Sequence, residues 1–176
     1  MSYFSVDVEA DGPVPGPYSL VCFGAVLVKD GFNDTFYGTT KPISANHIPE
    51  ALAISGFSRQ EHEKFDDPRE TFLKFRAWLT AVNAPGTSMI FITDNLAFDW
   101  QWINYYFHVY GDGNPFGFSG RRIGDMYAGL VKDPRKPWKK ELRTTKHDHN
   151  PVNDAKGNAE AILVMRDKYG LNIKLK

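Results

Sequence analysis

The 176-residue sequence has little cysteine, no net charge and no long apolar run. Cys22 is its single cysteine, which excludes an intramolecular disulfide framework and a zinc site built from several thiolates. The longest apolar run, Leu20 to Val28, has nine residues, whereas about 20 are needed to span a bilayer. We therefore expect no membrane span and no disulfide-stabilised scaffold.

The start of the chain also lacks the pattern of an export signal. Asp7 and Glu9 interrupt the first ten residues, where a basic start followed by an apolar stretch would be required. The lone cysteine suits a reducing compartment. We predict a cytoplasmic protein with no membrane partner.

The composition predicts a compact chain. Apolar residues make up 42% and aromatic residues 14% of the sequence, against 24% charged residues, which is enough for a sizeable core. The length predicts a single domain over residues 1–176. The 21 basic and 21 acidic side chains cancel, and that total by itself argues against a nucleic-acid partner.

Hydrophobic patterning predicts three leading strands. Tyr3 to Val8 is the first, and the almost wholly apolar segment Leu20 to Val28 is typical of a strand buried on both faces. Asp30-Gly31 supplies a turn into a third strand, Phe32 to Thr39. These strands form an antiparallel start.

Helical patterns follow, alternating with two more strands. Asp67 is a helix cap with Pro68 at the first position, and Phe72, Phe75 and Leu79 recur at helical spacing as a core stripe. The later elements are expected at Met89 to Ile92 (strand), Asp99 to Tyr110 (helix), Arg121 to Gly124 (strand), Asp125 to Val131 (helix) and Pro151 to Tyr169 (helix). This order predicts an α/β fold with a five-stranded mixed sheet and helices on its faces.

Two carboxylates stand out on the first strand. Asp7 and Glu9 are two residues apart, so their side chains project from the same face of the sheet. In a central strand such charges are costly unless a cation compensates them. A basic side chain from elsewhere in the chain or a divalent metal would serve.

Two further sites of interest lie at helix starts. Asp99 follows the strand Met89 to Ile92, at the carboxyl end where open sheets place their ligands. With Asn150 as helix cap and Pro151 at the first position, His149 and Asp154 take the two positions that contact each other in a hydrophobic staple. This geometry predicts an imidazole near a carboxylate, although Asn153 is an alternative cap.

Together these residues resemble the motifs of the DEDDh family of 3′ to 5′ exonucleases. Asp7-Val8-Glu9 is similar to the first motif, Asn95-Leu96-Ala97-Phe98-Asp99 to the second, and His149 with Asp154 to the third. The resemblance covers nearly the whole chain and implies a ribonuclease H-like fold. Many members continue the first motif with Thr-Thr-Gly, where this chain has Ala10-Asp11-Gly12 and a proline-rich loop.

The resemblance also implies an activity. Asp7, Glu9, Asp99 and Asp154 would hold two Mg²⁺ or Mn²⁺ ions, and His149 would take the proton from the attacking water. The reaction would be hydrolysis of the 3′-terminal phosphodiester of a single-stranded nucleic acid, with release of nucleoside 5′-monophosphates. Three residues within or beside the motifs are candidate substrate contacts: Ala10, Asn95 and Phe98.

The basic residues are concentrated in one window. From Arg121 to Lys146 there are nine basic and three acidic side chains, whereas residues 1–120 carry seven basic and fourteen acidic ones. We expect Lys139 and Lys140 in this window to guide phosphates, and Trp138 to stack on a base. The neutral total therefore hides a distribution that suits a nucleic-acid partner.

Several alternatives stay open at this stage. The small size without an attached polymerase resembles stand-alone exoribonucleases, which favours RNA over DNA and suggests a homodimer with the aromatic helix Asp99 to Tyr110 as interface. A proofreading-type DNA exonuclease and a non-catalytic binding module are the other readings. His147 and His149 form a pair that could bind zinc, but the sequence places no further ligands nearby.

Overall fold

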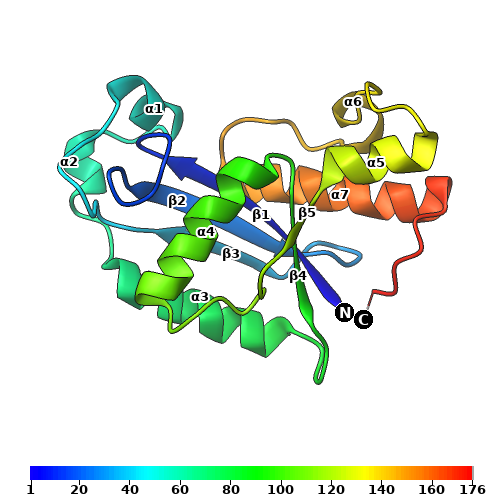
Figure 1. Cartoon of the computed structure of the whole chain (residues 1–176), viewed down its shortest axis with the longest axis horizontal. Helices are drawn as coiled ribbons and strands as arrows, with labels where there is room; N and C mark the ends of the chain where they lie inside the picture. The colour runs from blue at the N-terminus through cyan, green and yellow to red at the C-terminus, as the bar shows by residue number, and fades with distance from the viewer. Residues whose placement is uncertain (176) are drawn as a thin grey trace.

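The computed structural model describes residues 1–175 and contains a five-stranded mixed sheet (Figure 1). The strand order is β3-β2-β1-β4-β5. Strand β1 pairs antiparallel with β2 and parallel with β4, and β4 pairs parallel with β5. The strands are β1 (Ser2–Ala10), β2 (Leu20–Leu27), β3 (Thr35–Thr39), β4 (Met89–Thr93) and β5 (Gly120–Arg122). The predicted α/β fold with leading antiparallel strands is confirmed.

Helices cover both faces of this sheet (Figure 1). On one face α3 and α4 pack over a core that contains Phe4, Phe75 and Trp102, and on the other α5 and α7 enclose a second core around Ile92 and Ile162. The helices are α1 (Pro49–Ile54), α2 (Arg59–His62), α3 (Pro68–Val82), α4 (Leu96–Tyr110), α5 (Ile123–Val131), α6 (Lys139–Leu142) and α7 (Pro151–Tyr169). No helix within residues 1–175 is long and apolar enough to cross a membrane.

Most predicted elements are present, and the differences fall at their ends. Helix α4 begins at Leu96 rather than at Asp99, so Asp99 lies within the first turn instead of at the start. Gly124 belongs to α5 rather than to the preceding strand. The short helices α1, α2 and α6 were not predicted, because four to six residues carry too little periodicity to register.

The aromatic helix α4 uses its large side chains within the chain's own core. Trp102, Tyr106 and Phe107 are fully buried, and Trp100 and Tyr105 are half-buried against the same core. The Tyr106 hydroxyl accepts a hydrogen bond from the Leu20 backbone N–H at 2.8 Å. One face of α4 is therefore core, as predicted, and its partly exposed aromatic side chains leave the subunit interface a prediction.

A glycine sets the position of α7 on the sheet. Gly24 pairs with Asp7 across β1 and β2, and a Cβ atom at Gly24 would come within 2.4 Å of the Pro151 carbonyl carbon. The absence of a side chain therefore lets the first turn of α7 lie directly on β2. This contact carries the start of α7 toward the end of β1, where the candidate site lies.

Candidate active site

Four carboxylates converge at the C-terminal ends of the neighbouring parallel strands β1 and β4. Asp7 and Glu9 lie on β1, while Asp99 and Asp154 lie in the first turns of α4 and α7. Asp99, Asp154 and Glu9 are close enough to Asp7 that each raises the pKa of its carboxyl group. The structure thus brings together residues that are separated by up to 147 positions in the sequence, from Asp7 to Asp154.

Asp99 is 3% exposed and anchored to the end of β4. The Thr93 hydroxyl donates a short hydrogen bond to Asp99 Oδ2. Burial nevertheless raises the pKa of Asp99 to about 8, with the Thr93 bond opposing the shift and Asp94 adding to it. The ionised form of this carboxyl group therefore lacks sufficient positive charge around it.

Asp7 and Glu9 show the same excess of negative charge. Burial is the main cause that holds the pKa of Asp7 well above its usual range, and the neighbouring carboxylates add to it, while Arg143 lowers it. Burial also raises the pKa of Glu9, against the opposing influence of His149. A divalent cation would favour the ionised forms of all these groups, and oxygen ligands of this kind suit Mg²⁺ or Mn²⁺.

Asp154 is held from three directions. Its Oδ1 accepts a hydrogen bond from Arg143 Nη2 at 2.9 Å and lies 2.7 Å from His147 Nδ1, and its Oδ2 accepts from the His149 backbone N–H at 3.2 Å. The Arg143 side chain is only 6% exposed and lies over Gly157, where a Cβ atom would come within 2.5 Å of the guanidinium. Asp154 is therefore fixed before any metal binds.

His149 precedes α7 as predicted, with Asn150 as the cap. The Asn150 side chain accepts from the backbone N–H groups of the first turn, and His149 adopts a left-handed backbone with φ of 59°. The imidazole of His149, however, lies beside Glu9, with Nδ1 3.4 Å from Oε1, and its backbone rather than its ring reaches Asp154. The predicted imidazole–carboxylate contact thus exists with a different carboxylate.

His147 supplies the contact that was expected of His149. Its ring lies 4.5 Å from that of His149, centroid to centroid, and its Nδ1 contacts Asp154. Ligand atoms of His147, His149 and Asp154 all lie within 4.8 Å of one another, so the structure provides the third zinc ligand that the sequence did not reveal. The Arg143 guanidinium on the same Asp154 oxygen opposes a cation at that point.

A pocket of about 450 Å³ opens beside Glu9 and His149. Three predicted substrate residues, Ala10, Asn95 and Phe98, line it. The sequence did not reveal the other apolar lining residues, which are Gly12, Pro13, Ile48, Ala51 and Ile54. The Ile48-Pro49 dipeptide, with proline at the first helical position, was the available signal for the last three of these residues.

The remaining predicted substrate residues lie in a separate pocket, of about 560 Å³, next to Asp94 and Arg122. Trp138 is 6% exposed and belongs to the second core, so its stacking face is covered and the predicted base stacking is wrong for this structure. Lys139 Nζ pairs with Asp94 Oδ2 at 2.6 Å, while Lys140 is exposed. Lys140 is therefore the freer of the two predicted phosphate contacts.

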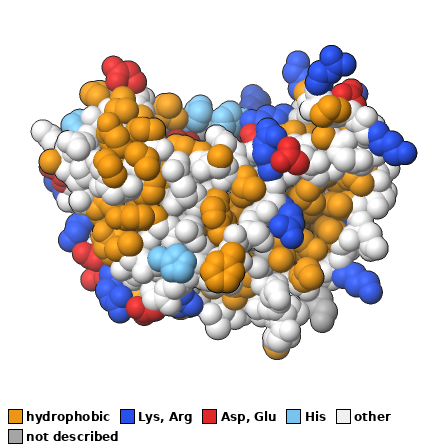
Figure 2. All heavy atoms as spheres, in the orientation of Figure 1, with side chains coloured by type: hydrophobic (Ala, Val, Ile, Leu, Met, Phe, Trp, Pro, Cys, Tyr) orange, Lys and Arg blue, Asp and Glu red, His pale blue; other side chains and the backbone are white. Residues whose placement is uncertain are grey.

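Figure 2 shows how these features lie on the surface. Histidine side chains are seen in a hollow at the upper edge, between a hydrophobic lobe over α1 and a lobe over α6 that carries Lys and Arg side chains. Arg143 departs from that pattern, because it points inward to Asp154. Some basic residues of the window Arg121 to Lys146 thus lie on the surface beside the hollow, whereas Arg143 points into the interior beneath it.

Comparison with solved structures identifies the fold. The nuclease domain of 3′hExo, a DEDDh family member bound to rAMP, superposes with a TM-score of 0.74 and 18% identity, covering 99% of this chain and 96% of that one. Escherichia coli exonuclease I in complex with a dA16 oligonucleotide gives a TM-score of 0.68 and 16% identity, covering 95% of this chain and 41% of that one. The chain thus has the ribonuclease H-like fold of these exonucleases.

Sequence comparison extends this result. No family model matches the chain. The chain is 36% identical over 183 residues to the 3′-5′ DNA exonuclease Cap18 of Escherichia coli, covering 98% of this chain and 95% of the relative. The protein belongs to the DEDDh family of 3′-5′ exonucleases, as its motifs predicted.

Proposed function

We propose that this protein is a metal-dependent 3′-5′ exonuclease that removes nucleoside 5′-monophosphates from single-stranded 3′ ends. The observation that carries the proposal is the convergence of four carboxylates and His149 at one sheet edge, beside a pocket that a terminal nucleotide can enter. Residues 1–176 would act as a single exonuclease domain on this scaffold.

The carboxylates fit a pair of divalent cations. Asp7, Glu9, Asp99 and Asp154 are the proposed ligands, because burial and mutual repulsion raise the pKa of Asp7 and leave its ionised form in need of positive charge. When bound, such ions stabilise the charge that develops on the phosphodiester and favour ionisation of water. Mg²⁺ and Mn²⁺ are the proposed ions.

His149 is the proposed general base. Its Nδ1 lies near Glu9 Oε1, and that carboxylate favours the tautomer with the proton on Nδ1. The lone pair on Nε2 is then available to accept the proton of the attacking water. The His149 side chain is 50% exposed, so water and substrate can reach it.

We propose single-stranded DNA as the first substrate to test. The preference for RNA rested on the small size of the chain, but the relative Cap18 is covered over 95% of its own length and is named a DNA exonuclease. Small size therefore does not favour RNA. The 3′hExo structures include one with rAMP and one with a histone mRNA stem-loop, so RNA is the second candidate.

A time course tests the function and the choice of sugar. Single-stranded DNA and RNA, labelled at either end, are incubated with Mg²⁺ or Mn²⁺ and with EDTA as control. We expect 5′-labelled strands to shorten in steps of one nucleotide, 3′-labelled strands to release labelled mononucleotide at once, and DNA to be degraded faster. Binding without hydrolysis in either metal would contradict the proposed function.

The oligomeric state stays a prediction. A homodimer was expected from the small exoribonucleases that the sequence resembles, with the aromatic helix as one possible interface, and of its aromatic side chains Trp100, Tyr105 and Tyr110 are partly exposed. Light scattering at micromolar concentration is the measurement, and a monomer at that concentration would contradict the predicted homodimer.

A further inference from the structure

A third carboxylate follows Asp7 and Glu9 at the same spacing but takes no part in the proposed reaction. Asp11 lies one residue beyond β1 and is 0% exposed. Its backbone N–H donates to the Ser19 carbonyl at 2.9 Å, and its own carbonyl accepts from the Ile48 N–H at 2.8 Å. The backbone of Asp11 therefore joins the end of β1 to the start of β2 and to the start of α1.

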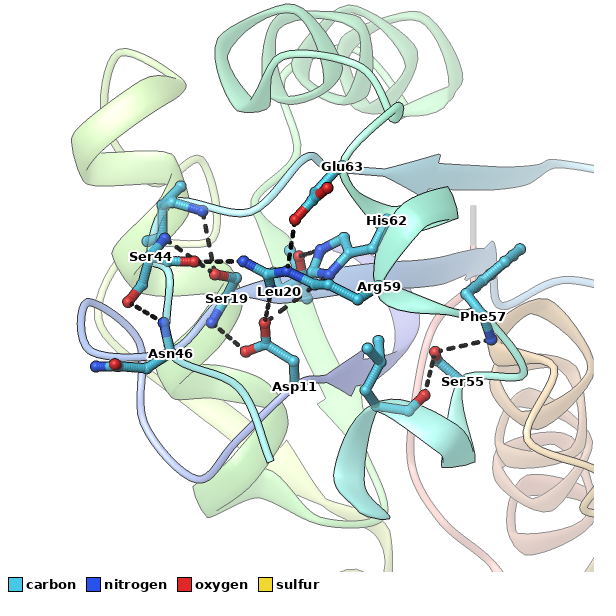
Figure 3. Close-up of polar contacts among 12 residues, drawn as sticks. Asp11, Ser19, Leu20, Ser44, Asn46, Ser55, Phe57, Arg59, His62 and Glu63 are labelled. Atoms are coloured by element: carbon cyan, nitrogen blue, oxygen red, sulfur yellow. Dashed lines mark hydrogen bonds and ion pairs between the residues drawn. The ribbon is translucent and has the colours of Figure 1, made fainter. Parts of the chain in front are cut away.

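The Asp11 side chain extends this connection to α2 (Figure 3). Oδ1 accepts from the Ser19 backbone N–H at 2.5 Å, and Oδ2 accepts from Arg59 Nη1 at 3.0 Å. Arg59 in turn donates from Nη2 to the Ser44 carbonyl at 2.7 Å and from Nε to Glu63 at 3.2 Å. One guanidinium thus holds the end of β1 and the segment that leads to α1.

Two further groups complete the network. The Ser19 hydroxyl accepts from the backbone N–H groups of Ile43 at 3.1 Å and Ser44 at 3.3 Å. His62, also 0% exposed, places Nδ1 3.8 Å from Asp11 Oδ2, on the same side as Arg59 (Figure 3). Asp11 is therefore enclosed by the Ser19 N–H, the Arg59 guanidinium and the His62 ring, and Arg59 supplies the positive charge that a buried carboxylate requires.

The elements joined by this network form the apolar wall of the pocket. Ala10, Gly12 and Pro13 flank Asp11 in the sequence, and α1 contributes Ile48, Ala51 and Ile54. Helix α1 has six residues, and an isolated helix shorter than about 12 residues is marginal in water. The position of this wall therefore depends on its tertiary contacts, and the contacts through Asp11 and Arg59 bear directly on it.

We propose that Asp11 and Arg59 are positioning residues that fix the wall of the terminal-nucleotide pocket and so set how tightly the enzyme holds the 3′ end. The inference rests on the proposed function. Neither side chain lines the pocket beside Glu9 and His149, so both act through the wall rather than on the reacting groups. The departure of Ala10-Asp11-Gly12 from the family's Thr-Thr-Gly pattern supplies the carboxylate on which the network depends.

The first experiment compares two Arg→Met substitutions. Arg59→Met breaks the buried pair, whereas Arg69→Met breaks an exposed pair with Asp112, 3.1 Å long, elsewhere on the chain. For Arg59→Met we expect KM for a single-stranded oligonucleotide to rise about tenfold while kcat stays within about twofold. Arg59→Lys, which keeps the charge but not the fork to Ser44, should lie between wild type and Arg59→Met. An unchanged KM in Arg59→Met, or an equal rise in Arg69→Met, would overturn the proposal.

A second measurement does not need turnover. Hydrogen–deuterium exchange should accelerate in residues 11–19 and 48–54 of Arg59→Met, while β1, β2 and β4 keep their protection. Uniform acceleration, or none, would overturn the positioning role. The double variant Asp11→Asn/Arg59→Met removes both charges, so it should recover thermal stability relative to Arg59→Met while KM stays high. If wild type does not hydrolyse nucleic acid, the proposed function fails, yet the exchange pattern still decides whether the network positions the wall.

Discussion

Asp7 is half-buried on β1 and Asp11 is fully buried one residue beyond its end, and their surroundings are opposite. Burial is the largest cause of the raised pKa of Asp7, and Asp99, Asp154 and Glu9 each raise it further, with Arg143 opposing them. Burial also leaves the pKa of Asp11 raised, but there the neighbouring groups, the Ser19 N–H, His62 and Arg59, all oppose the shift. One carboxylate lacks positive charge and the other is surrounded by donors.

This difference distinguishes a candidate cation-binding site from a structural ion pair. A buried carboxylate with donors on every side contributes to the fold, and removing a partner leaves a charge uncompensated. A cluster in which four carboxylates share one guanidinium, that of Arg143, costs free energy in the metal-free chain and therefore indicates a place for a cation. The two ends of the same five-residue stretch, Asp7 to Asp11, thus serve different purposes.

The largest effect is expected from Asp7→Ala. Loss of a proposed metal ligand should lower kcat at least about a thousandfold in Mg²⁺, because the reaction depends on charge stabilisation at this site. Product release from labelled single-stranded DNA is the measurement. Unimpaired turnover by Asp7→Ala would falsify the metal assignment.

The contrast between Asp7 and Asp11 can be tested by measuring the free energy of unfolding of variants at each position. Asp11→Asn should lower the free energy of unfolding by about 3 kcal/mol, since Arg59 loses its buried partner. Asp7→Asn should leave the unfolding free energy of the metal-free protein unchanged or higher, because it relieves repulsion. Urea unfolding in EDTA measures both, with Asp66→Asn, which breaks an exposed pair with Lys74, as control. Equal losses in the two variants would remove the distinction.

The basic surface beside the site can be tested by charge reversal. Lys139→Glu combined with Lys140→Glu should raise KM about tenfold at low salt and flatten the dependence of KM on salt concentration. Lys140→Glu alone should account for most of the change, because Lys139 is already paired with Asp94. Steady-state rates at several salt concentrations give the answer, and an unchanged KM at low salt would exclude this surface.

The dependence of stability on pH tests whether the carboxylates of the site lack compensating positive charge. The pKa of Asp99 is about 8 in the folded, metal-free chain, against about 3.9 when unfolded. Between these two pH values the unfolded state binds fewer protons than the folded state. The free energy of unfolding should therefore fall as pH rises from about 4 to about 8. In EDTA we expect Tm to be about 10 °C lower at pH 8 than at pH 5. Asp99→Asn should make the decline shallower, and an identical slope would count against it.

The smallest effect is expected at His147. Because Arg143 opposes a cation on the shared Asp154 oxygen, His147→Ala should leave the Mg²⁺ concentration for half-maximal activity within about twofold of wild type. Zinc binding, followed with a colorimetric chelator in excess Mg²⁺, should be weak in both proteins. Tight zinc binding that disappears in His147→Ala would instead support the zinc alternative.

Much of the fold was predictable because its signals are local. The apolar run that forms β2, the Asp67-Pro68 start of α3 and the Asn150-Pro151 start of α7 each depend on a few adjacent residues. Helices α1, α2 and α6 were missed because four to six residues show too little periodicity, although Pro49 and the Ser58–Glu61 capping box are local signals for α1 and α2.

The site was predictable only in part. The motif residues of β1, α4 and α7 lie together as the sequence suggested, but Trp138 was assigned to the surface although it is packed in the second core. Sequence position does not reveal whether an aromatic side chain near lysines faces water or the interior. The contact of His147 with Asp154 was likewise hidden, because it depends on the left-handed backbone at His149.

The sequence by itself determined the family, the mixed sheet and the carboxylates that belong to the site, because motif spacing and hydrophobic patterning are properties of the chain. Tertiary structure alone decided which carboxylates stay uncompensated. Asp7, Glu9 and Asp11 look alike along the chain, and it is the arrival of Arg59 at Asp11, and of Asp99 and Asp154 at Asp7, that gives them different electrostatic surroundings.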